Sequence, residues 1–163
     1  MIFEQNIAKL VIGDIHLGSM PAIALQALEQ GLDTPSLRIL AGLQENENEF
    51  TLRRHLEDAL RELSIEIPDK RQATLQVAIR IANEIIAARR PVVEGVNEMF
   101  LKIDKYPFHD ETSKRRYDSI GLQEVYIIFI NAESCRDEGS PDENLEQELL
   151  TELKTWSRQF KDR

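Results

Sequence analysis

The sequence is poor in the residues that interrupt regular secondary structure. Its 163 residues include only 7 glycines and 6 prolines, so tight turns and long loops must be few. Leucine, alanine, glutamate, glutamine and arginine, which have high helix propensity, are abundant instead. The composition therefore favours a chain that is mostly helical.

Cysteine and long hydrophobic runs are also scarce. Cys135 is the single cysteine, so the fold does not depend on an intramolecular disulfide or on an oxidising compartment. The longest apolar run, residues 125–130, is far too short to cross a bilayer. The N-terminal residues do not resemble a signal peptide, because Glu4 and Lys9 interrupt the early apolar positions. We therefore expect a cytoplasmic protein with no membrane partner.

Positive charge is in the minority. The formal net charge is −9, and phosphate binding draws on lysine and arginine. The balance therefore weighs against nucleic acid as a partner. An acidic surface can instead engage a basic protein.

The length of the chain fits one domain with a hydrophobic core of its own. Apolar residues at helical spacing predict helices over residues 2–15, between Ser19 and Gly31, and over residues 35–42, 48–63, 70–89 and 91–103. A last helix follows Ser140. We predict a single all-α domain over residues 1–163, with about seven or eight helices in an orthogonal or irregular bundle.

Capping signals support several of these boundaries. Thr34 precedes Pro35 at a helix start, and Asn48 precedes the next helix. Two capping boxes are predicted, one between Asp69 and Gln72 and one between Ser140 and Glu143. On the outer side of helix 48–63, spacing also predicts the ion pairs Arg54–Asp58 and Glu57–Arg61.

Residues 125–130 (VYIIFI) are open to two interpretations. Their β-branched and aromatic side chains are typical of a buried strand. The length and the flanking residues also suit a buried helix. No second strand candidate exists to pair with this segment, and a lone strand is not stable. We therefore predict a helix.

Residues 102–119 form the least regular part of the chain, and we predict an irregular loop there. Loops of this length often carry function. The candidate binding residues are Tyr106, His109, Asp110, Arg115, Arg116 and Tyr117. A carboxylate beside an imidazole can orient it or change its acidity, which leaves a small hydrolase or metal-dependent enzyme as an alternative to a binding loop. No catalytic residue is assigned.

Recognised catalytic and cofactor motifs are missing. The three histidines, His16, His55 and His109, show no metal-ligand spacing, and there is no phosphate loop, GxSxG or CxxC. An acidic cluster over residues 133–148 does not match an EF-hand and suits a solvated loop or a docking surface for a basic partner. We expect neither a metal nor another cofactor.

The last predicted helix carries an apolar stripe that includes Leu149, Leu153, Trp156 and Phe160. Such a stripe packs into a core or mediates self-association. If it is an oligomer interface, Trp156 is buried only in the assembly.

One half of the chain has a familiar pattern. Its residues are Ala27-Leu28-x-x-Gly31-x-Asp33-Thr34-Pro35-Ser36-Leu37-Arg38-x-Leu40-Ala41-Gly42-Leu43, Leu60-x-x-Leu63, Ile67-Pro68 and Pro91-Val92-x-x-Gly95. Residues 22–101 thereby resemble small bacterial all-helical proteins of unknown function. The resemblance implies a helical domain and no particular activity, and some such proteins accompany toxins.

The function hypotheses follow from these observations. The first is a protein-binding module, regulatory or immunity-like, with an unidentified protein partner. The second is self-association through the C-terminal stripe, and the third is an enzyme that uses His109, Asp110 and nearby carboxylates.

Overall fold

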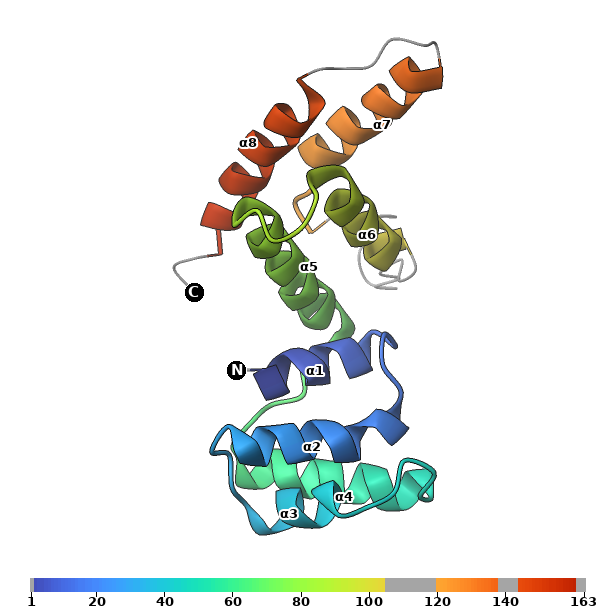
Figure 1. Ribbon diagram of the computed structural model, residues 1–163, viewed down its shortest axis with the longest axis vertical. Coiled ribbons are helices and arrows are strands. Elements are labelled where there is room, and N and C mark those ends of the chain that lie inside the picture. Colours follow the sequence, from blue (N-terminus) through green and yellow to red (C-terminus); the bar gives the residue numbers. More distant parts are fainter. Residues whose placement is uncertain (1, 105–119, 138–143, 161–163) are drawn as a thin grey trace, which may run out of the picture. The chain divides into compact units, whose positions relative to one another are not determined.

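The computed structural model describes residues 2–104, 120–137 and 144–160. Within these ranges the chain forms eight α-helices, one 3-10 helix and no strand, which confirms the all-α prediction. The elements in chain order are α1 (Ile2–Val11), η1 (Leu17–Ser19), α2 (Met20–Glu29), α3 (Pro35–Ala41), α4 (Glu49–Glu62), α5 (Lys70–Ile86), α6 (Val92–Asp104), α7 (Gln123–Asp137) and α8 (Leu145–Arg158) (Figure 1).

The apolar segment 125–130 lies inside α7, so the prediction of a helix there is confirmed. Val125 and Phe129 are buried, whereas Tyr126, Ile127 and Ile130 are exposed. A strand would have placed alternate residues on one face. The observed burial follows the helical spacing of i and i+4 instead.

The chain divides into two units, which we call unit 1 (residues 1–74) and unit 2 (residues 75–163). The division shows only where the contacts within the chain are concentrated, so it does not test the predicted single domain over residues 1–163, which stays a prediction.

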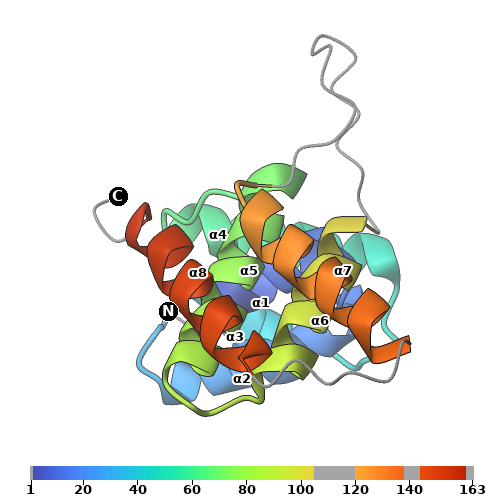
Figure 2. The ribbon, with the colours of Figure 1, turned by 90° about the horizontal axis from the view of Figure 1, so that it is seen from above.

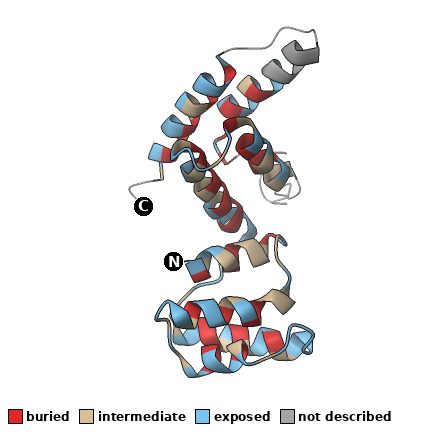
Figure 3. Ribbon diagram, viewed as in Figure 1, coloured by how far each residue is buried: buried red, intermediate tan, exposed pale blue. Residues whose placement is uncertain are grey.

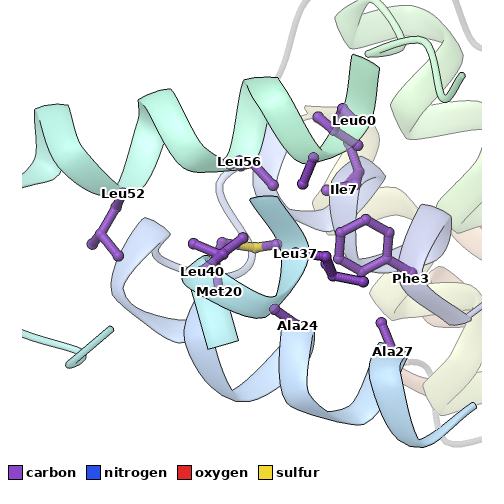
Figure 4. Close-up of a cluster of buried hydrophobic side chains, with 11 residues drawn as sticks. Phe3, Ile7, Met20, Ala24, Ala27, Leu37, Leu40, Leu52, Leu56 and Leu60 are labelled. Carbon is purple, nitrogen blue, oxygen red and sulfur yellow. The ribbon is translucent and has the colours of Figure 1, made fainter. Parts of the chain in front are cut away.

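Unit 1 has a core built by α1 to α4. Figure 4 shows Leu52, Leu56 and Leu60 pointing from α4 toward side chains of the other helices. The core residues are Phe3, Ile7, Met20, Ala24, Ala27, Leu37, Leu40, Leu52, Leu56, Ala59 and Leu60. The short helix α3 packs against both α2 and α4. Each helix contributes its apolar stripe and leaves a polar face outside, as amphipathic helices do.

Unit 2 is formed by most of α5 and by α6 to α8. Seen from above, α7 lies beside α6 and α8 (Figure 2). One row of α5, Val77, Ile81 and Ile85, is buried. Two further apolar residues of α5, Leu75 and Ile79, are only half-buried. Figure 3 shows how buried residues alternate with exposed ones along these helices.

Side chains cap the N-termini of three helices as the sequence predicts. The Thr34 hydroxyl accepts from the Leu37 N–H at 3.3 Å at the start of α3, and Asn48 caps α4. Before α5, the Asp69 carboxylate accepts from the Gln72 N–H, and the Gln72 side chain accepts from the Asp69 N–H. This is the reciprocal capping box. The predicted box between Ser140 and Glu143 lies outside the described residues.

Four helices end in the same left-handed turn. In α1, α2, α4 and α5 the residue after the C-cap has positive φ, at Gly13, Gly31, Ser64 and Ala88. Its N–H and that of the following residue bond back to helix carbonyls, for example Ser64 N–H to Arg61 and Ile65 N–H to Leu60. This Schellman arrangement satisfies carbonyls that the helix end leaves open.

These turns correct two predicted helix boundaries. The first helix ends at Val11 rather than Ile15, because Gly13 turns the chain. The fifth ends at Ile86 rather than Arg89, because Ala88 takes the left-handed conformation. Gly31 ends the second helix as predicted. Ser19 occupies the N-cap position of α2 but makes no side-chain capping bond.

The predicted ion pairs on α4 are wrong. Arg61 donates to Asp58 at 2.7 Å, one turn back along the helix. Asp58, the predicted partner of Arg54, therefore pairs with Arg61, which was the predicted partner of Glu57. Arg54 makes no ion pair within the described ranges.

A carboxylate from α4 fastens the start of α3. Glu62 accepts from the Ser36 hydroxyl at 2.7 Å and from the Ser36 N–H at 3.0 Å. The bonds from the Ser36 hydroxyl, the Ser36 N–H and the Thr34 hydroxyl hold the pKa of Glu62 below its usual value of 4.5. The charged carboxylate therefore links the two helices at neutral pH.

We expect Ser64→Gly and Ala88→Gly to stabilise the protein by about 0.5 to 1 kcal/mol each. A residue with a β-carbon is strained at positive φ, whereas glycine is not, and the lost strain outweighs the extra freedom of the unfolded chain. Urea unfolding followed by far-UV circular dichroism measures the change. Ser19→Gly, at a position with φ of −78°, is the matched control and should stabilise nothing. Lower stability of both test variants would contradict the assignment of strain.

We expect acidification to weaken unit 1 through Glu62. Because its pKa is depressed in the folded state, the carboxylate stabilises the fold above about pH 4.5, and this contribution is lost as the pH falls through the lowered pKa. Glu62→Gln should therefore lower the melting temperature at pH 7 and reduce its pH dependence. Thermal melts between pH 7 and pH 3 test this.

Glu66→Gln is the control for that experiment, because Glu66 is exposed and makes no hydrogen bond within the described residues. Its melts should follow the parent protein at every pH. The account of Glu62 fails if the two variants behave alike. Some pH dependence should persist in Glu62→Gln, because Arg38 also lowers the pKa of Asp33 through a direct hydrogen bond.

Candidate functional site

The loop residues predicted as a binding site lie outside the described residues. This holds for Tyr106, His109, Asp110, Arg115, Arg116 and Tyr117, and for much of the acidic cluster at residues 133–148. The binding loop and the enzyme that would use His109 and Asp110 therefore stay predictions.

The remaining histidines do not assemble a site. His16 is exposed just before η1, and His55 is half-buried on α4. No three His, Cys, Asp or Glu residues within the described ranges lie close enough together to hold a metal ion. None of the helices there is both long and apolar enough to cross a membrane.

The C-terminal stripe is part of the interior of the chain. Leu149, Leu153 and Trp156 are buried in the single chain, and Phe160 is half-buried with its ring against Trp156. Trp156 is therefore buried without an assembly. The sequence pattern identified an apolar stripe correctly, but it could not distinguish a core face from an interface.

Trp156 fixes the turn before α7. Its indole N–H donates to the Ile120 carbonyl at 2.9 Å, and Ile120 itself has a positive φ of 48°. A β-carbon on the next residue, Gly121, would lie 3.4 Å from the indole nitrogen, and Gly121 also has positive φ. The strained turn is thus held by a hydrogen bond from α8 and by the close approach of the ring.

Four charged side chains connect α5 to α6 in unit 2. Glu84 bonds to Arg80 and to Arg90, and Arg90 also bonds to Glu98. Burial alone would raise the pKa of Glu84, but the hydrogen bond from Arg90 and the charges of both arginines hold it below its usual value. Two positive and two negative charges cancel, so we interpret the group as a structural link rather than a ligand site.

This link also requires close packing at the start of α6. A β-carbon at Gly95 would lie 2.6 to 2.7 Å from the side chain of Ile85 and 2.9 Å from that of Arg90. The absence of a side chain at Gly95 therefore lets α5 and Arg90 approach α6 closely.

An exposed apolar face on α7 is the feature that the core does not explain. Ile127 is 51% exposed, Tyr126 is 45% exposed and Ile130 is 39% exposed. Their spacing along the helix places them on one face, beside the face that buries Val125 and Phe129. Gln123 and Asn131 extend this set at its two ends and are exposed as well. We call Gln123, Tyr126, Ile127, Ile130 and Asn131 the α7 face.

None of the five residues of the α7 face is acidic or basic, although 30% of the chain is charged and the exposed Glu124 adjoins the face beside Gln123. Tyr126 is held in place on one side, since the ring of Phe100 from α6 meets it edge-on with centroids 5.1 Å apart. A half-exposed ring with a fixed position loses little conformational freedom on binding. The arrangement can therefore bind an apolar protein surface.

Sequence reasoning missed this face, although a signal was present. A helix over residues 125–130 has only apolar residues all round its surface, whereas α7, which packs against α6 and α8, buries only some of them. Some of these residues had to remain exposed once the segment was a helix. Which of them stay outside depends on where α6 and α8 pack, and the sequence does not contain that information directly.

Comparisons with known proteins identify no relative. No family model matches the chain, and neither the curated proteins nor the solved structures include a match to it.

We expect Trp156→Phe to destabilise unit 2 by about 1 to 3 kcal/mol, because the bond to the Ile120 carbonyl is lost and a smaller ring fills the site. Hydrogen exchange of the amides in α7 and α8 measures the change locally. Phe160→Leu is the control at a half-buried ring and should cost less. Unchanged protection around residue 120 in Trp156→Phe would contradict this role of the indole.

Proposed function

We propose that the chain is a protein-binding module that holds its partner through the α7 face. The observation that carries the proposal is the cluster of Tyr126, Ile127 and Ile130, exposed together on a helix without a charged residue among them. Regulatory and immunity-like proteins, which act by binding another protein, are one class that this function would include.

The chemistry of the face supports a protein partner. Exposed isoleucine and tyrosine side chains gain free energy when an apolar surface covers them. Tyrosine is also enriched among the residues that contribute most to interfaces, and its hydroxyl can remain bonded to water or to the partner. The amides of Gln123 and Asn131 supply polar groups at the ends of the cluster, as the rim of an interface does.

The experiment is a capture from native cell extract with three forms of the chain, read by mass spectrometry. The test variant carries Ile127→Gln and Ile130→Gln, which remove the apolar surface without adding charge and keep good helix formers. The control is Leu25→Gln on α2, since Leu25 is also 51% exposed. Circular dichroism checks that all three forms are folded.

We expect a stoichiometric protein to be retained by the parent and by Leu25→Gln, and to be lost about tenfold with the double variant. The proposal fails if the double variant retains the same proteins. Light scattering of the purified chain provides the other arm. The parent chain could have the mass of a dimer or larger oligomer while the double variant has the mass of a monomer. That result would make the face a site of self-association and would overturn the proposal that it binds a different protein.

A further inference from the structure

The outer face of α4, in unit 1, carries a second unusual set of side chains. Leu52, Leu56 and Leu60 point from α4 into the core (Figure 4), so the opposite side of the helix faces outward. Phe50, Arg53, Arg54, Glu57 and Arg61 lie there and are exposed. Phe50 is 74% exposed, the highest value among the exposed large hydrophobic side chains of the described residues.

Two guanidinium groups stand beside the exposed ring. Arg53 and Arg54 follow Phe50 by three and four residues, so both lie on its face, one helical turn away. Neither makes an ion pair within the described residues, because Asp58 bonds to Arg61 instead. The face thus offers one apolar anchor and two cations that make no ion pair within the described residues, with the exposed Glu57 one turn further along the same face.

The backbone around Phe50 is already ordered. Its N–H donates to the Asn48 side chain at 2.8 Å, which is the N-cap bond of α4. The ring therefore starts from a fixed backbone position in the first turn of the helix. A fixed anchor reduces the entropy that is lost when a partner covers it.

We propose that this face of α4 binds an acidic segment of a protein, whose carboxylates pair with Arg53 and Arg54 while an apolar residue covers Phe50. Guanidinium groups bind carboxylates through two parallel hydrogen bonds, and arginine and aromatic residues dominate the energetics of many interfaces. The site lies in unit 1 and uses none of the residues of the α7 face, so it goes beyond the proposed function.

A protein segment fits this face better than nucleic acid does. Three exposed glutamates, Glu45, Glu47 and Glu49, come directly before Phe50. An extended polyanion that reached Arg53 and Arg54 would also meet these carboxylates and a chain of net charge −9. A segment with two or three carboxylates at one place can pair with the arginines and avoid the glutamates.

The probe for the test is a fluorescein-labelled peptide of about 20 residues, rich in alanine, serine and glycine, with one leucine and two or three glutamates beside it at its centre. A second peptide has lysine in place of every glutamate, and a third probe is a single-stranded oligonucleotide of similar length. Fluorescence anisotropy measures binding to the full chain. We expect the glutamate peptide to bind more tightly than the lysine peptide, and its affinity to fall as salt rises.

Three variants of the full chain locate the site. Arg53→Gln with Arg54→Gln should weaken the glutamate peptide about tenfold, and Phe50→Ala should weaken it by a similar factor. Replacing both arginines by lysine should restore only part of the affinity, because lysine cannot bind a carboxylate with two parallel bonds. The control, Lys154→Gln with Arg158→Gln, removes the same charge from exposed positions of α8 and should change little.

Two results would overturn the inference. One is a glutamate peptide that binds no better than the lysine peptide, or whose affinity the α4 variants leave unchanged. The other is tighter binding of the oligonucleotide that depends on Arg53 and Arg54, since this would assign the face to nucleic acid. The capture experiment with the α7 double variant tests only the α7 face. Its result does not affect the inference about α4, because the variants of the two faces share no residue.

Discussion

Helix ends determine how this chain folds back on itself. Every helix leaves N–H groups at its start and carbonyls at its end without partners, and short connections are stable only when other groups bond to them. Thr34, Asn48 and the pair Asp69 and Gln72 do so at three starts. Left-handed turns do so at four ends. With so little glycine and proline, the chain relies on these local bonds for its changes of direction.

Glu62 extends the same principle from local to tertiary structure. Its carboxylate bonds to the backbone and side chain of Ser36, a residue at the start of a helix far away in sequence. A single negative charge thus satisfies part of one helix start and joins it to the end of another helix. The core around α3 is the region that this bond positions, since α3 packs on both α2 and α4.

Much of the fold could be predicted because its causes are local. A capping residue and the helix that it starts lie next to each other in sequence, and the apolar period of each helix depends only on its own residues. The end of the helix before Ser64 was predicted, but the end at Ala88 was not, and the left-handed conformation of these two residues could not be predicted in this way. Glycine is the expected residue at such positions, and only the packing of the flanking segments shows that a residue with a β-carbon occupies them.

The candidate surfaces depended on non-local information. Sequence spacing assigned Asp58 to Arg54, whereas the folded chain gives it to Arg61, which changes the charges that remain available on α4. Likewise, residues 125–130 are all apolar, and the sequence does not show which of them are exposed. That depends on where α6 and α8 pack against α7. The apolar stripe with Trp156 is the opposite case. Its pattern would also suit an interface between chains, but its residues Leu149, Leu153 and Trp156 are buried within the single chain.

The two surfaces differ in physical character. The α7 face is uncharged, so a partner there would be held mainly by the removal of apolar area from water, and salt would affect the complex little. The outer face of α4 combines a ring with two cations, so charge would also guide the approach of a partner. Rising ionic strength would therefore weaken binding at the outer face of α4 and leave binding at the α7 face largely unchanged.

The position of Trp156 makes the two units optically unequal. The chain has one tryptophan and three tyrosines, at positions 156, 106, 117 and 126, and all four belong to unit 2. Unit 1 contains only phenylalanine among the aromatic residues, at Phe3 and Phe50. Intrinsic fluorescence excited near the tryptophan band therefore originates in one half of the chain, and an emission spectrum that stays native leaves the state of residues 1–74 entirely unseen.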